Sequence, residues 1–289
     1  MPLIPSFSIP LPSGRTLSLG PRTLVMGIIN VTPDSFADGG ERFDAGRAIA
    51  DAEQMAADGA DVIDIGGEST RPGAPALPAD EEWRRVAPVI AGVRQRVAVP
   101  LSIDTYKAGT ARRAIELGAD IVNDISALAH DPPLARVVAE TGAAVVLMHN
   151  RGSSANIYEH AQYGDVMAEV VAELRARMTA AGAAGIREDR IVVDPGFGFA
   201  KRAEHTLEAL AELPRLAALG RPILAGPSRK SFLKIALGDV PPAERVWGTA
   251  AAVAASVLSG AHIVRVHDVR QMVQVARVAD AIRAARVSL

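Results

Sequence analysis

The 289-residue sequence contains no cysteine, few aromatic residues (4%) and almost no net charge. The missing cysteines exclude disulfides and thiolate metal sites. Its 31 basic and 33 acidic residues nearly cancel, which argues against a surface for nucleic acid or for an anionic membrane. Apolar runs are short, and the Ala-rich segment 249–262 has fewer than the about 20 residues that span a bilayer.

The first twenty residues have no basic start followed by a long apolar segment. We therefore expect no signal peptide and a cytoplasmic location. Hydrophobic residues make up 49% of the chain, enough for one large core, and the length is close to the roughly 250 residues of an α/β barrel. We expect residues 1–22 to form an N-terminal extension packed as a short hairpin, and residues 23–289 to form one domain.

Eight short, nearly continuous apolar runs have the pattern of buried parallel strands. They lie at 23–30, 61–66, 100–104, 120–124, 144–149, 191–195, 222–226 and 262–267, with helices predicted between them, among others at 44–58, 80–97, 107–117, 163–184, 205–219, 244–259 and 269–285. Gly/Pro-rich loops follow the first two strands. The alternation predicts a single (β/α)8 TIM barrel with extended loops after strands 1 and 2; an open doubly wound sheet is the alternative.

Nearly every predicted strand finishes on a polar side chain. These are Asn30, Asp64, Asp104, Asn123 with Asp124, His149, Asp194, and Arg265 with His267. A single one is explained by a helix cap or a loop hydrogen bond. Barrel enzymes, however, place their chemistry at the C-terminal face, so a full ring of such residues predicts a functional site there.

The ring divides into two kinds of group. Asp104, Asn123 and Asp194 suit a flat heterocycle rich in N–H donors, such as a 2-amino-4-oxo pterin. Arg71, Arg265 and His267, near the hydroxyls of Ser69 and Thr70, suit an anion such as a diphosphate. Asn30 and a phosphate provide the hard oxygen ligands that Mg²⁺ prefers. Lys230 fits a Schiff-base nucleophile, a solvated surface charge or a hydrogen-bond donor.

An ordered set of motifs resembles the dihydropteroate synthase family. They are GIINVTPDSFADGG (27–40), DIGGESTRPGA (64–74), SIDTYK (102–107), IVNDIS (121–126), VLMH (146–149), DPGFGFAK (194–201), GPSRKSF (226–232) and RVHDV (265–269). The resemblance covers the chain from about Leu24 to its end. It implies a TIM barrel that joins p-aminobenzoate to 6-hydroxymethyl-7,8-dihydropterin diphosphate. Such enzymes form 7,8-dihydropteroate and diphosphate in folate synthesis.

The resemblance also implies site residues. The residues of the pterin pocket are Asp104, Asn123, Asp194 and Lys230, with Met148 and Phe199 as walls. The residues of the diphosphate site are Asn30, Thr70, Arg71, Arg265 and His267. The residues on the p-aminobenzoate side are Phe36, Pro72, Phe199, Lys230 and Ser228, and Asp38 is a loop contact. Lys230, Arg265, His267 and Asp104 are the expected catalytic residues, and Asn30 is the expected Mg²⁺ ligand. The resemblance further implies a homodimer. It also implies sensitivity to sulfonamides, because the first loop, DSFADGG (34–40), does not have the altered sequence of sulfonamide-insensitive relatives.

Three other functions stay open at this point. A pterin-dependent methyltransferase shares the barrel and the acidic pterin ring, but it has no use for the anion site at Arg265 and His267. A Schiff-base aldolase-type barrel would use Lys230 as its nucleophile. A non-catalytic pterin-binding protein would have no need of the residues that hold a leaving group. Asn150 and Thr206 depart from the residues common in the family.

Overall fold

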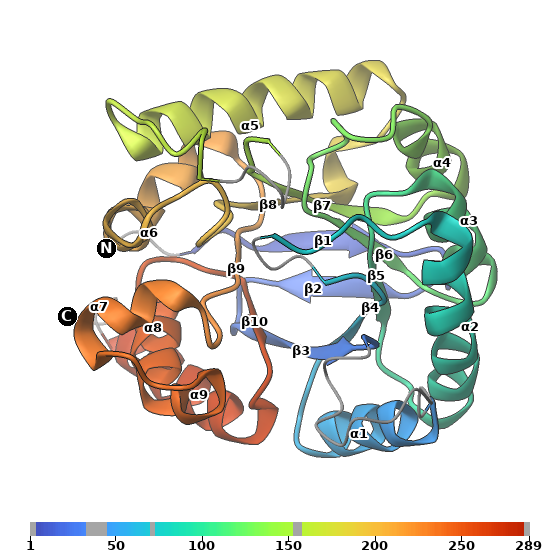
Figure 1. Cartoon of the computed structure of the whole chain (residues 1–289), viewed down its shortest axis with the longest axis horizontal. Coiled ribbons are helices and arrows are strands. Elements are labelled where there is room, and N and C mark those ends of the chain that lie inside the picture. The colour runs from blue at the N-terminus through green and yellow to red at the C-terminus, as the bar shows by residue number, and fades with distance from the viewer. Residues whose placement is uncertain (1–3, 33–44, 70–72, 153–157, 286–289) are drawn as a thin grey trace.

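The computed structural model describes residues 4–32, 45–69, 73–152 and 158–285 (Figure 1). Eight parallel strands form its centre: β3 (Leu24–Asn30), β4 (Val62–Gly66), β5 (Leu101–Asp104), β6 (Ile121–Asp124), β7 (Ala144–Met148), β8 (Ile191–Asp194), β9 (Leu224–Ala225) and β10 (Ile263–Val266). Their order is β8-β7-β6-β5-β4-β3-β10-β9. A parallel bridge between Val193 and Ile223 links the two ends, so the sheet closes on itself. The predicted TIM barrel is confirmed.

The strands are apolar because they are covered on both faces. Val25, Ile29, Ile63 and Ile65 belong to a large core between the barrel and its helices. The strand predicted at 222–226 has only two residues in the ladder. Pro222 has no N–H, and the N–H of Ile223 donates to the His262 ring over 3.1 Å, so the ladder with β10 begins only at Leu224.

The helices surround the barrel (Figure 1). They are α1 (Ala45–Ala57), α2 (Ala79–Arg96), α3 (Ala108–Glu116), α4 (Pro133–Thr141), α5 (Val166–Ala183), α6 (Ala203–Ala211), α7 (Lys234–Leu237), α8 (Val246–Leu258) and α9 (Val269–Ala285), with 3₁₀ turns η2 (Glu188–Arg190), η3 (Leu213–Leu219), η4 (Ser231–Leu233) and η5 (Pro242–Glu244). The helix predicted at 205–219 is divided between α6 and η3, because Pro214 lacks the N–H that would continue an α-helix. Within the described ranges, no helix is both long and apolar enough to cross a membrane.

A hairpin closes one end of the barrel. β1 (Phe7–Pro10) and β2 (Thr16–Leu19) pair antiparallel. Ile9, Leu17 and Leu19 pack in one buried cluster with the residues that begin the barrel strands, including Leu24 and Val62. These are the N-terminal ends of the strands, so the opposite, C-terminal end is left for a site (Figure 1).

We predict that truncation of the hairpin core destabilises the whole barrel. Leu19 is completely buried, so Leu19→Ala removes packed methyl groups and leaves a cavity. The free energy of unfolding should fall by roughly 2–5 kcal/mol in urea denaturation. Ser18→Ala on the exposed face of the same strand is the matched control and should change it by less than about 0.5 kcal/mol. Equal stabilities of the two variants would show that the hairpin is only an appendage.

Candidate active site

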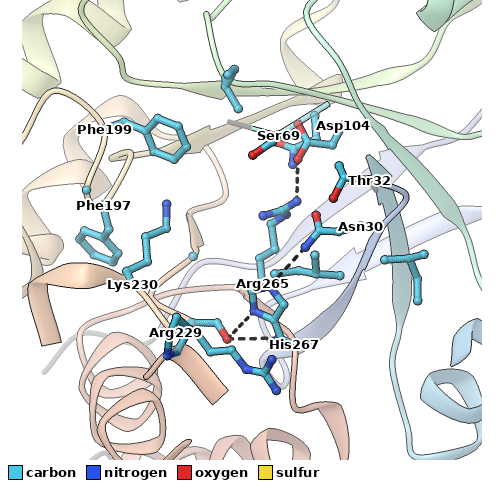
Figure 2. A pocket seen from close by; sticks show the side chains of 18 of the residues that line it. Asn30, Thr32, Ser69, Asp104, Phe197, Phe199, Arg229, Lys230, Arg265 and His267 are labelled. Atoms are coloured by element: carbon cyan, nitrogen blue, oxygen red, sulfur yellow. Dashed lines mark hydrogen bonds and ion pairs between the residues drawn. The ribbon is translucent and has the colours of Figure 1, made fainter. Parts of the chain in front are cut away.

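The C-terminal ends of the barrel strands surround one cavity of about 670 Å³ (Figure 2). Ten of the predicted site residues line it: Asn30, Asp104, Asn123, Met148, Asp194, Phe199, Ser228, Lys230, Arg265 and His267. Acidic, amide and cationic groups therefore share one space. Phe36, Asp38, Thr70, Arg71 and Pro72 lie outside the described residues.

Arg265 is the central cation of the cavity. Its Nε donates to Asp64 Oδ2 over 2.6 Å, and one terminal nitrogen donates to Asp104 Oδ2 over 2.6 Å. Asn123 Nδ2 donates to the same Asp64 oxygen over 3.0 Å. The sequence placed Arg265 on the anion side only, whereas the structure ties it directly to the acidic group. Asp64 was part of the predicted polar ring but not of the predicted pockets, and it is completely buried beneath them.

Burial shifts the titration of the acidic and basic groups. It raises the pKa of Asp194, against the lowering effect of a hydrogen bond of 2.7 Å from the Gly196 N–H. Burial also raises the pKa of Asp104, although Arg265 acts in the opposite direction. It lowers the pKa of Lys230 to about 7. Charges held in so little water interact strongly with any polar ligand that replaces that water.

Lys230 lies against the apolar wall of the cavity (Figure 2). Its Nζ is 3.9 Å from the centre of the Phe199 ring, which is a cation–π distance. Phe199 packs with Met148 and Ile125 in a small buried cluster. The site thus combines an aromatic surface for a ring with an amine that can donate to a substituent of that ring.

His267 and Asn30 occupy the other side. The backbone N–H of His267 donates to Ser228 Oγ over 3.2 Å, and the ring nitrogen Nδ1 of His267 lies 3.0 Å from the same oxygen. Asn30 Nδ2 is 3.5 Å from His267 Nε2, at the outer limit of a hydrogen bond. All three contacts are satisfied when Nδ1 carries the proton and Nε2 accepts from the amide. The amide oxygen of Asn30 then faces away from His267 (Figure 2).

Two further residues were not recognised from the sequence. Arg229 has a left-handed backbone (φ 58°), and its side chain forms two hydrogen bonds, of 3.0 and 2.5 Å, with Asp268. This geometry separates the Arg229 side chain from its neighbour Lys230 (Figure 2). Ser231 begins η4, is exposed and lines the cavity, whereas the predicted Ser228 hydroxyl is engaged with His267. Ser228 was assigned from the resemblance to the family, and no sequence signal singled out Ser231, which lies at the helix start.

We predict a pH-dependent stability difference from His267. Burial lowers the pKa of His267 to about 3, and Arg229 and Arg265 act in the same direction. At pH values between the ordinary histidine pKa of about 6.5 and this lower value, His267 binds a proton in the unfolded chain but not in the folded chain. The free energy of unfolding therefore falls as pH falls, by up to about 1.4 kcal/mol per pH unit from this group.

His267→Gln should lack that contribution. Urea unfolding at several pH values from about 6.5 down to about 4.5 should give it a flatter pH slope than the parent chain. The exposed His130→Gln is the control and should keep the parent's slope. Parallel slopes for the parent and His267→Gln would contradict the prediction.

Comparison with known proteins agrees with this geometry. The profile of the family described as "Pterin binding enzyme" matches residues 26–267. A dihydropteroate synthase of Synechocystis is 47% identical over 277 residues, covering 96% of each chain. A structure of Xanthomonas albilineans dihydropteroate synthase with 4-aminobenzoic acid superposes with a TM-score of 0.90 at 45% identity, covering 97% of this chain and 99% of that one.

A second structure of the Xanthomonas enzyme, in complex with 7,8-dihydropteroate, gives a TM-score of 0.85 at 43% identity and covers 94% and 97% of the two chains. The range matched by the family profile contains every residue that lines the cavity. The chain belongs to the pterin-binding enzyme family, whose similar members are dihydropteroate synthases.

Proposed function

We propose that this chain acts as a dihydropteroate synthase, joining p-aminobenzoate to 6-hydroxymethyl-7,8-dihydropterin diphosphate with release of diphosphate. The observation that carries the proposal is the single cavity in which Asp104, Asp194 and Lys230 lie together with Arg265 and His267. A pterin ring and its anionic leaving group need both sets of groups at once. The names of the similar proteins agree with this assignment.

The acidic groups suit the pterin ring. A carboxylate accepts hydrogen bonds from an amino group and an adjacent ring N–H, the pattern that a pterin presents. Asp194 and Asn123 come from separate strands, and Lys230 supplies a donor for the ring carbonyl. Phe199 and Met148 cover the faces of the ring.

The chain's charges also suit the expected reaction. When the C–O bond to diphosphate breaks, positive charge develops on the pterin methylene and ring, and Asp104 and Asp194 stabilise it. Arg265 would hold the departing diphosphate, and the neutral His267 would join it once the anion replaces the Asn30 amide and the ring proton lies on Nε2, with Nδ1 accepting from the Ser228 hydroxyl. The arylamine then attacks with its free lone pair and loses a proton, so no protein nucleophile is required.

Mg²⁺ is part of the proposal. Among the described residues, no group of three or more His, Asp or Glu side chains could hold a metal ion, so the protein would supply few ligands. The Asn30 amide oxygen fits an ion that is carried mainly by diphosphate oxygens and water. When bound, Mg²⁺ would neutralise charge on the leaving group.

The arylamine side rests on fewer described residues. Phe199 offers a face for the p-aminobenzoate ring, and Ser231 at the start of η4 offers an exposed hydroxyl for its carboxylate. Ser228 stays a predicted contact. Sulfonamides resemble p-aminobenzoate in shape and charge, so we expect them to compete with it. The cytoplasmic location also stays a prediction.

The alternatives explain less of the cavity. A methyl transfer would leave the anion-binding groups Arg265 and His267 without a role. The low pKa of Lys230 suits Schiff-base chemistry, but its contact with Phe199 and its place opposite Asp194 equally suit a donor to the pterin. Dihydropteroate synthases at 47% and 45% identity favour the synthase.

The function is tested by measuring diphosphate release from the pterin diphosphate. Release should require both p-aminobenzoate and Mg²⁺, and removal of the ion with EDTA should abolish it. Asp104→Asn should weaken pterin binding by roughly 10- to 150-fold, the loss expected for a hydrogen bond to a charged group. Asp80→Asn on the exposed start of α2 is the matched control. Failure of the parent chain to release diphosphate with both additions present would refute the function.

We also propose that the chain forms a homodimer through α7, α8 and α9. Trp247 is 80% exposed, and Ile235 and Val278 are more than half exposed, on three helices that lie together (Figure 1). A contiguous surface patch of large apolar side chains is typical of an interaction site, and we infer that these three helices form one. Trp247→Glu should convert a dimer to a monomer in sedimentation velocity, whereas Leu117→Glu, on an exposed leucine after α3, should not. A monomeric parent chain would refute the proposal.

A further inference from the structure

Lys201 is a buried cation that the reaction described above does not use. Its side chain is 1% exposed, and it is among the largest completely buried side chains of the described chain. No carboxylate of the described residues lies within ion-pair distance of its Nζ. A buried ammonium without a counterion costs free energy, and burial lowers the pKa of Lys201 to about 7. The groups around Lys201 must therefore compensate for the burial of its charge.

The three N–H donors of Lys201 have three acceptors. Nζ lies 2.8 Å from His149 Nδ1, 3.3 Å from the carbonyl oxygen of Gly196 and 3.2 Å from the carbonyl oxygen of Phe199. Two of these acceptors belong to the turn 195–200 that follows β8. Lys201 therefore fixes the backbone of that turn at two points.

This turn carries two parts of the pterin side. The Gly196 N–H donates to Asp194 Oδ1 over 2.7 Å. Gly196 therefore orients the Asp194 carboxylate through its N–H, while its carbonyl oxygen is held by Lys201. Phe199, whose carbonyl Lys201 also holds, lines the cavity and covers Lys230. The backbone here is unusual, since Gly196 and Ala200 both have positive φ and a Cβ at Gly196 would meet the His149 carbonyl oxygen at 2.0 Å. Such a turn needs external support.

The support continues outward from Lys201. His149 is buried with a pKa lowered to about 4, so its ring is neutral near pH 7. Its Nδ1 accepts from the Lys201 ammonium, and Nε2–H then donates to Glu173 Oε2 on α5 over 3.1 Å. Arg151 Nε donates to the same carboxylate over 3.0 Å. Glu173 thereby selects the tautomer that Lys201 requires.

We propose that Lys201 is a positioning residue for the pterin substrate: held by His149 and Glu173, it fixes the turn that orients Asp194 and presents Phe199. The proposal rests on the proposed synthase function. Lys201 also places a positive charge near Asp194, where Lys230 and Arg265 are the other cations that act on that carboxylate. Geometry and charge therefore both favour an ionised, correctly oriented Asp194.

The test is steady-state kinetics of Lys201→Met over a range of pH. KM for the pterin diphosphate should rise by about tenfold, while KM for p-aminobenzoate changes by less than about twofold. Without the nearby cation the pKa of Asp194 rises, so the acidic limb of the kcat/KM profile should move to higher pH. A folded Lys201→Met enzyme with unchanged pterin KM and an unchanged acidic limb would overturn the proposal.

A second series applies even if Lys201→Met does not fold. Glu173 is half exposed, and Glu173→Leu removes the acceptor for His149, whereas Glu173→Gln keeps an oxygen there. Leucine should raise the pterin KM severalfold and glutamine should restore it. Glu169→Ala, on the same helix and also paired with Arg151, does not contact His149 and should behave like the parent. Equal pterin KM values across the series would overturn the proposal. A parent chain without synthase activity would instead refute the proposed function.

Discussion

The forked contact of Arg265 with Asp64 and Asp104 is the interaction on which the site depends. It joins β10 to β4 and β5 across the barrel interior. Removing either carboxylate leaves a largely buried cation with half its partners, and removing Arg265 leaves the carboxyl groups of Asp64 and Asp104 without their shared cation. The charge of Arg265 also acts on Asp194, Lys230 and His267, where it works to lower the pKa of each group.

Parallel register makes that arrangement possible. Asn30 is paired with Gly66, Gly66 with Asp104, and Asp104 with Asn123, so the polar side chains of Asn30, Asp104 and Asn123 come from one level of the barrel. Asp64 lies two residues below the end of β4, which places it beneath the ligand-facing ring. Its depth makes it a partner for Arg265 and Asn123 rather than a group that lines the cavity.

The sequence was sufficient for the barrel, and every predicted site residue that the structure describes lines the cavity. Continuous apolar runs such as 24–29 are typical of strands buried on both faces, and the polar residue after each run marks the C-terminal end. The pairing of those polar groups could not be read in the same way. The contact between Arg265 and Asp104, rather than with a bound diphosphate alone, depends on the strand register. The accessibility of Ser228 or of Ser231 depends on the backbone conformation at Arg229. Contributions from Phe36, Asp38, Thr70, Arg71 and Pro72 stay predictions.

The hairpin of β1 and β2 restricts the route by which small molecules enter and leave the barrel. It fills the N-terminal end of the barrel with Ile9, Leu17 and Leu19, so the interior is a dead end rather than a tunnel. Whatever occupies the space beside Asp194 must leave by the mouth through which it came. An inhibitor wedged over that mouth would accordingly trap a deeper occupant as effectively as it excludes a new one.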